Sequence, residues 1–438
     1  MILAWPLILA TCSNVIQQFV DKVFLGQYSQ DALAACLPAG MVSGLIIHFF
    51  IGIILYVSNF IAQFRGAEEY DKIPIILNQG FILSVVFGII CFFLGFAGNF
   101  LFETVAKHDA NLAALEIVYF RPTMNYAIVT LIGCSVMSFF IGIEKTQVIL
   151  YAIIILTITN IILDYVLIFG KFGFKEMGLA GAAYATIIAY TLACLFLICN
   201  LFFGKYKEAY KVQIKIKFDY INFKKLIKYG VPSSIQVTVN SLIWTIFIMI
   251  IGKFSITQLV ASNIVLQLDQ IAVMPIMGVG SAVSILIANE LGKEEQKSLN
   301  MIVKTGVSIS IIYNFIVCLL FIFIPEILIL PFTDINNPDE ELIGITINIL
   351  KILALYVIFD GWGYILSSVL KGAGDTVFIM WIIFICGIIL IICPAFIALK
   401  INSLYCAWWG AFSYIIVICM IFLIRVKQGK WKKIKIIA

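Results

Sequence analysis

The polar residues inside long apolar stretches are the side chains of this sequence that could do chemistry. Asp21, Asp164 and Thr186 each lie five to eight residues from a glycine at the edge of such a stretch. At about 1.5 Å per residue of helix, all three then lie roughly 8–12 Å from the same face of a membrane. Asn160 comes four residues before Asp164 and shares its helix face. Two carboxylates, an amide and a hydroxyl at one depth can hold a proton or a dehydrated Na⁺, whereas the alternative is a polar network that only joins helices.

A second and weaker group lies in the C-terminal half. Asp360 lies midway along one apolar stretch and Asn240 midway along another, at similar depth. With a single carboxylate, the group is either an ion site or a core acid whose hydrogen bonds are satisfied within the protein. Asp269 lies in a third apolar stretch, where it either lines a cleft or bonds a neighbouring helix.

Composition decides the class of protein that must position these side chains. The chain of 438 residues is 63% hydrophobic and 12% charged, whereas soluble proteins are about 45–50% apolar and about 25% charged. This excludes a water-soluble globular protein, and the uninterrupted apolar runs exclude an outer-membrane barrel with its alternating strands. The 11 cysteines and 2 histidines show no metal-ligand spacing. We expect an all-α polytopic membrane protein that contacts lipid, with no cofactor, no metal beyond a possible bound Na⁺ and no nucleic-acid partner.

Twelve apolar stretches are long enough for a membrane-spanning helix, which needs about 20 residues. They cover residues 2–26, 34–63, 74–102, 113–142, 147–169, 178–203, 226–252, 257–289, 298–330, 342–370, 376–399 and 404–424. The longest polar connection contains seven lysines and leaves six spans on each side. We therefore expect an N-lobe at 1–203, a cytoplasmic linker at 204–225, a C-lobe at 226–425 and a basic cytoplasmic tail at 426–438.

Lysine and arginine gather on one side of the twelve expected spans. That side receives the linker lysines, the basic tail and Arg65, while the other receives only Lys107, Lys171, Lys175, Lys253 and Lys400. Because basic connections stay in the cytoplasm, the sequence predicts a multi-pass protein of the cell (inner) membrane with both termini cytoplasmic.

The two halves repeat each other at a constant offset. A shift of 226 residues places Pro6 on Pro232, and after a four-residue insertion a shift of 230 places Gly142 on Gly372. Since each half has six spans, the copies are parallel repeats related by an axis along the membrane normal. This predicts two six-helix lobes around a central cleft, an architecture suited to alternating access. Pro6 deletes a helix hydrogen bond, so it either bends the first helix during the cycle or makes a static kink.

Several motifs, in this order and spacing, resemble the multidrug and toxic compound extrusion (MATE) transporters. The resemblance covers nearly the whole chain and rests mainly on the segments 21–26, 62–66, 160–170, 178–186, 230–232 and 370–376. It implies an antiporter that exports amphipathic, often cationic drugs or metabolites in exchange for inward H⁺ or Na⁺. We expect a small-molecule substrate and a functional monomer.

The resemblance also implies roles for single residues. The family's ion-coupling site falls on Asp21, Asn160, Asp164 and Thr186, and its bending proline falls on Pro6.

Two positions depart from the family pattern. Some members use a Glu/Asp pair in the C-lobe, but this chain has Asn240 at the position of the glutamate beside Asp360 at that of the aspartate. That departure favours the N-lobe site. Lys22, where many relatives carry a small polar residue, is the second departure.

Two other functions fit the sequence less well. A flippase for pyrophosphate-linked lipid precursors would line its cleft with several basic residues, and only Arg121 and Lys351 are candidates. A membrane-embedded enzyme would need a metal site or a nucleophile with a histidine base. Since His48 is isolated and His108 lies in a loop, we expect no enzyme.

Overall fold

The computed structural model describes residues 3–204, 206–212, 218–293, 296–332 and 339–437, which are mostly helical and include no strand. Their contacts divide them into two compact units, one up to Ser234 and one from Ile235 to Ile436. We call these the N-terminal unit and the C-terminal unit. The change of unit falls inside one long helix, and the lobe and linker boundaries around 204–225 stay a prediction.

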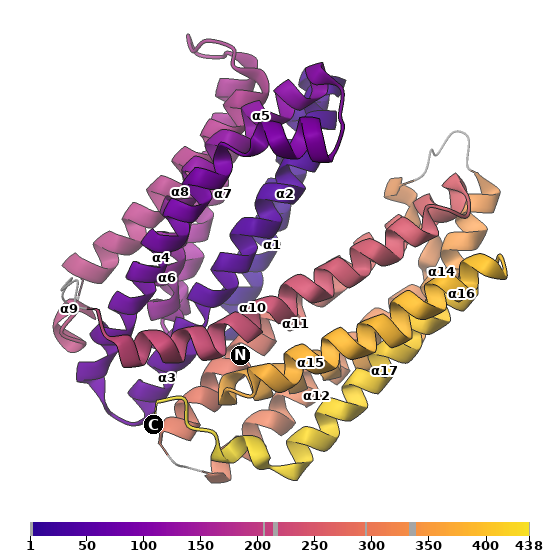
Figure 1. Cartoon of the computed structure of the whole chain (residues 1–438). Coiled ribbons are helices and arrows are strands. Elements are labelled where there is room, and N and C mark those ends of the chain that lie inside the picture. The colour runs from indigo at the N-terminus through magenta and orange to yellow at the C-terminus, as the bar shows by residue number, and fades with distance from the viewer. Residues whose placement is uncertain (1–2, 205, 213–217, 294–295, 333–338, 438) are drawn as a thin grey trace. The chain divides into compact units, whose positions relative to one another are not determined.

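Long helices joined by short connections build the N-terminal unit (Figure 1). In chain order they are α1 (Ala4–Tyr28), α2 (Gln30–Leu55), α3 (Val57–Gly66), α4 (Ile73–Gly95), α5 (Ala110–Asn125), α6 (Ala127–Gly142), α7 (Thr146–Phe169) and α8 (Gly178–Phe203). Three short segments accompany them, η1 (Tyr70–Lys72), the π-helical η2 (Phe100–Val105) and α9 (Tyr206–Ala209).

The helix α10 (Tyr220–Ile251) contains the change of unit and leads into the C-terminal unit. The helices that follow are α11 (Ile256–Gly292), α12 (Gln296–Phe323), α13 (Pro325–Ile329), α14 (Glu340–Ala373), α15 (Thr376–Gly387), α16 (Cys393–Lys400) and α17 (Leu404–Gln428). Short segments are η3 (Leu330–Phe332), the π-helical η4 (Ile388–Ile392) and η5 (Lys430–Lys433).

Length and hydropathy confirm an all-α membrane protein. In the described residues 10 helical spans are long and apolar enough to cross a membrane, and α5 with α6 makes an eleventh that is bent by 43°. The first expected span corresponds to α1, in which only Ala4–Ser13 passes as an apolar helix, because Gln17, Asp21 and Lys22 follow. Large apolar side chains such as Phe92 are exposed along the helices, as lipid contact requires. The chain is a multi-pass membrane protein.

Several expected spans are interrupted rather than straight. The stretch 34–63 breaks at Tyr56 and the stretch 113–142 breaks at Tyr126. The stretch 298–330 breaks at Ile324, whose backbone leaves the helical region (φ −132°, ψ 39°) immediately before Pro325. A residue that precedes proline is disfavoured in the helical conformation, so the sequence itself causes this break.

The second helix of each repeat begins with the same cap. The Ser29 hydroxyl accepts from the backbone N–H of Asp31 at 3.2 Å and starts α2. The Ser255 hydroxyl accepts from the backbone N–H of Gln258 at 3.1 Å and starts α11. A serine before the first turn satisfies donors that the helix leaves free, and the two serines are 226 residues apart.

Equivalent glycine contacts recur in both units. A Cβ added at Gly142 would lie 2.8 Å from the carbonyl oxygen of Ser58, and one at Gly372 would collide with the carbonyl oxygen of Ser284. The shifts of 226 and 230 residues relate these contacts to each other. The same shifts relate two further pairs of contacts, Gly80 on Val57 with Gly306 on Val283, and Gly26 on Leu33 with Gly252 on Leu259. The repeat predicted from the sequence is therefore a repeat of helix packing.

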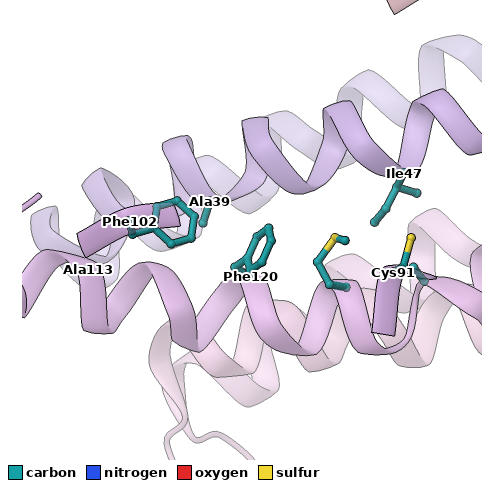
Figure 2. Packing of buried hydrophobic residues seen from close by; sticks show 8 residues of the cluster. Ala39, Ile47, Cys91, Phe102, Ala113 and Phe120 are labelled. Atoms are coloured by element: carbon teal, nitrogen blue, oxygen red, sulfur yellow. The ribbon is translucent and has the colours of Figure 1, made fainter. Parts of the chain in front are cut away.

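A dry apolar core joins four helices and the π-helical segment of the N-terminal unit (Figure 2). Its fully buried members come from α2, α4, η2, α5 and α6 and include Ala39, Cys91, Phe102 and Phe120. The rings of Phe102 and Phe120 meet edge to face with centroids 5.4 Å apart, a favoured aromatic geometry. Phe102 lies on η2, so this core fixes the segment that follows α4.

Candidate functional site

The two acids predicted for the N-lobe come together from different helices. Asp21 lies on α1 and Asp164 on α7, and their carboxyl groups are within reach of a side-chain hydrogen bond to each other. Asp164 is completely buried, and Asp21 is partly buried. A carboxylate pair of this kind needs a positive charge or a proton, because two ionised acids repel each other most strongly where water is scarce.

The amide and the hydroxyl predicted beside these acids also meet. Asn160 Nδ2 donates to Thr186 Oγ1 at 3.3 Å, which links α7 to α8. The close approach of the two helices depends on Gly181, because a Cβ there would lie 2.8 Å from the backbone of Leu167. Asn160 is four residues before Asp164 on α7, so all four predicted residues belong to one polar region.

Five oxygen atoms of this region are buried and have no hydrogen-bond partner among the described residues. They are Asp21 Oδ1, Thr157 Oγ1, Asn160 Oδ1 and both carboxylate oxygens of Asp164. Orphaned buried polar atoms cost free energy and are rare in folded proteins. An all-oxygen set fits a proton or a hard cation, and no group of three or more His, Cys, Asp or Glu residues in the described chain forms a transition-metal site.

Aromatic side chains close one end of the polar region. Phe24, one turn after Asp21 on α1, packs on Phe169 of α7 with ring centroids 6.0 Å apart. The Tyr28 hydroxyl donates to Glu176 Oε1 at 3.0 Å, which ties the end of α1 to the connection between α7 and α8. These contacts hold the helix of Asp21 against that of Asp164.

The sequence interpretation missed several residues at this site. Tyr119 of α5 hydrogen-bonds the thiol of Cys36 on α2, and its hydroxyl is acted on by the charges of both acids. Thr157 lies on the face of α7 that carries Asn160 and Asp164, and its spacing of three and seven residues could have revealed it. Nothing in the sequence connects Tyr119 to the acids, since it lies on another helix.

Pro6 lies in the first turn of α1, which begins at Ala4 in the described residues. A proline in the first turn removes no intrahelical hydrogen bond. Bending at Pro6 stays a prediction, because the chain that would continue the helix before Leu3 lies outside the described residues.

The C-terminal candidates are arranged differently from the expectation. Asn240 Oδ1 accepts a hydrogen bond from the Tyr414 hydroxyl at 3.0 Å. Asp269 of α11 instead lies where the charge of Asp360 on α14 acts on it. Of the two alternatives for Asp269, it faces an acid on a neighbouring helix.

The remaining charged and histidine candidates have local roles. Arg121 donates to Asn99 Oδ1 at 3.4 Å and lies over the ring of Phe96, while Lys351 is exposed on α14. His108 Nδ1 lies 2.9 Å from a carboxylate oxygen of Glu116, which is completely buried.

A family model matches the chain twice. The MatE model covers residues 6–166 and 232–397. The chain belongs to the MatE family. The two matches begin 226 residues apart, so the internal repeat predicted from the sequence is confirmed together with the resemblance.

Curated relatives of this MatE protein are similar along most of their length. A probable multidrug resistance protein YoeA from Bacillus subtilis is 27% identical over 85% of this chain and 80% of its own. A probable multidrug resistance protein NorM from Mesorhizobium japonicum is 24% identical over 85% of this chain and 81% of its own.

Solved structures share the fold. A MATE structure in the bent conformation superimposes with a TM-score of 0.89 at 19% identity, covering 98% of this chain and 95% of its own. A MATE structure in the straight conformation gives 0.88 at 19% identity, covering 98% and 96%.

Proposed function

We propose that this protein is a secondary active antiporter of the cell membrane that exports amphipathic, often cationic small molecules by alternating access. Inward movement of H⁺ or Na⁺ supplies the free energy. The observation that carries the proposal is the pair Asp21–Asp164, with its buried oxygen atoms that lack protein partners. The names of the curated relatives, which include multidrug resistance proteins, support export of small molecules.

Each side chain of the site has a defined part in this proposal. Asp21 and Asp164 bind the coupling cation, because a proton or Na⁺ neutralises one of two carboxylates that burial would otherwise leave uncompensated. Asn160 and Thr186 hold α7 and α8 together and supply further oxygen atoms. Cation release restores the repulsion between the acids and changes the relative stability of the two transport states.

The lipid flippase and the enzyme receive no comparable support. Arg121 is already engaged by Asn99 and Phe96, which leaves few basic side chains for a pyrophosphate. We propose a non-enzymatic protein with both termini in the cytoplasm, which follows from the lysine distribution.

Transport into and out of vesicles tests the proposal. The purified full chain is placed in lipid vesicles with a fluorescent organic cation, and ΔpH and ΔpNa are imposed separately. We expect one gradient to drive transport, and we expect Asp21→Asn and Asp164→Asn each to reduce it to the rate of empty vesicles. The exposed Asp31→Asn serves as the matched control and keeps the wild-type rate.

Two results would contradict the proposal. Transport that neither gradient accelerates excludes antiport of these ions. Full transport by both Asp21→Asn and Asp164→Asn, at normal protein levels in the membrane, excludes this pair as the coupling site.

A further inference from the structure

The C-terminal unit contains a second pair of facing acids. Asp269 lies on α11 and Asp360 on α14, and the carboxylate of Asp360 acts electrostatically on that of Asp269. These two helices approach each other closely, since a Cβ at Gly280 of α11 would lie 2.6 Å from Ser368 Oγ of α14. The backbone packing therefore fixes the relative positions of the two carboxyl groups.

A tyrosine hydroxyl points to a ligand at this pair. Tyr356 lies one helical turn before Asp360 on α14 and shares its face. It is 1% exposed, its hydroxyl has no hydrogen-bond partner among the described residues, and both acids act on it. Asp269 Oδ1 is likewise buried without a partner in the described chain. Two orphaned oxygen atoms beside a pair of acids are what an absent proton or cation would leave.

Asn240 does not complete this group. Its carbonyl oxygen accepts from the hydroxyl of Tyr414 at 3.0 Å, so this oxygen is already used within the protein. The second carboxylate comes from α11 instead of α10.

No basic side chain compensates the two acids. Among the groups that act on Asp269 and Asp360 in the described chain there is no lysine, arginine or histidine. The packed helix α12 offers the neutral Ser310 and Asn314 next to Gly361. The other titratable side chains near the pair are weak acids on α14 and α17, namely Tyr356, Tyr364, Tyr414 and Cys419.

We propose that Asp269, Asp360 and the Tyr356 hydroxyl form a second binding site for a monovalent cation, a proton or Na⁺, within the C-terminal unit. All three ligands are oxygen atoms, and one bound positive charge removes the repulsion between the acids while leaving the pair singly charged. Binding at this site is independent of the proposed function, and the inference rests on that function only for the claim that the bound cation takes part in export.

Carbodiimide labelling tests the site without any transport assay. Dicyclohexylcarbodiimide modifies protonated carboxyl groups in apolar surroundings, and mass spectrometry of the purified full chain locates the modified residues across a range of pH. We expect labelling at Asp269 or Asp360 that falls as the pH rises. Excess Na⁺ that slows this labelling assigns the site to Na⁺, and labelling indifferent to Na⁺ assigns it to the proton.

Variants decide whether the residues act as one site. In Asp269→Asn the half-point of Asp360 labelling moves to lower pH by about one unit, because a neighbouring negative charge is removed. In Tyr356→Phe the half-point moves to higher pH, because the ionised acid loses a donor. The exposed Glu326→Gln serves as the control and changes neither value.

A pH profile of Asp360 that both variants leave unchanged would overturn the site, as would failure of both acids to react at any pH. Loss of transport with intact labelling here would count only against the proposed antiport. The two ideas therefore fail separately.

Discussion

Two facing carboxyl groups in an apolar region set the chemistry of each unit. Taking an ionised carboxylate out of water costs several kcal/mol, and a second one nearby adds repulsion. Asp21 with Asp164, and Asp269 with Asp360, are therefore positions where binding of one small cation has a large effect on the stability of the surrounding helices. At this scale the protein needs no cofactor to couple ion binding to a change of structure.

His108 provides a residue-scale prediction about stability. Its ring nitrogen lies 2.9 Å from the completely buried carboxylate of Glu116. His108→Ala leaves that acid without its partner and should cost about 1–3 kcal/mol, which lowers the unfolding temperature of the purified protein. Glu116→Gln combined with His108→Ala should recover part of the loss, because no charge is then left buried.

The control for this change is His48→Ala, since His48 contacts only the carbonyl oxygen of Gly44 in its own helix. Equal effects of the two histidine substitutions, or strict additivity in the double variant, would refute a specific role for the buried pair.

Sequence spacing can identify site residues only along a single helix. Asn160 and Asp164 were predicted together because they are four residues apart, and Thr157 could have been added by the same rule. Tyr119 and the partnership of Asp269 with Asp360 depend on contacts between helices, which periodicity does not contain. The missed residues of both acid pairs are of this second kind.

Helices in this protein meet through glycines where backbones approach most closely. Gly372 of α14 faces the carbonyl oxygen of Ser284 on α11, and Gly142 of α6 faces that of Ser58 on α3. An added methyl group at either position must push two helices apart, which typically costs about 1–3 kcal/mol.

Substitution of Gly372 tests this packing at the scale of the element. We expect Gly372→Ala and Gly142→Ala each to lower the unfolding temperature in detergent. Gly344→Ala on α14 is the matched control, because a Cβ there meets nothing within 4 Å, and alanine is the better helix former by about 1 kcal/mol. A Gly372→Ala protein as stable as Gly344→Ala would exclude the close contact.

Apolar length predicts the helices but not their interruptions. The expected stretch 376–399 agrees with α15 through α16, yet a π-helical segment, Ile388–Ile392, lies within it. The break at Ile324 follows from Pro325, whereas those at Tyr56 and Tyr126 carry no comparable local signal. They depend on the neighbouring helices that surround each break.

Across the whole chain, the repeat preserves the packing and not the acids. The shifts that relate the glycine contacts place Phe247 at the position of Asp21 and Pro394 at that of Asp164. The pair in the C-terminal unit lies on the second and fourth spans of its repeat, whereas the pair in the N-terminal unit lies on the first and fifth. Motif searches based on the repeat could predict the frame, but not where the second pair would be.

Orientation in the membrane is the prediction that belongs to the whole molecule. Because lysines gather on the linker and the tail, a green fluorescent protein fused after Ala438 should fluoresce in cells. Alkaline phosphatase fused at Phe174, between α7 and α8, should be active because that connection faces outward. An active phosphatase at the C-terminus would reverse the predicted topology.

The paired glycine contacts also record how the gene diverged. If one half arose by duplication of the other, every position was then free to change in either copy. The charged positions have changed, while both glycines of a pair, such as Gly142 and Gly372, have remained, since any side chain there would collide with a carbonyl group. Steric exclusion has thus been the more persistent constraint on descent, and a new acid pair could be acquired on an inherited frame without rebuilding it.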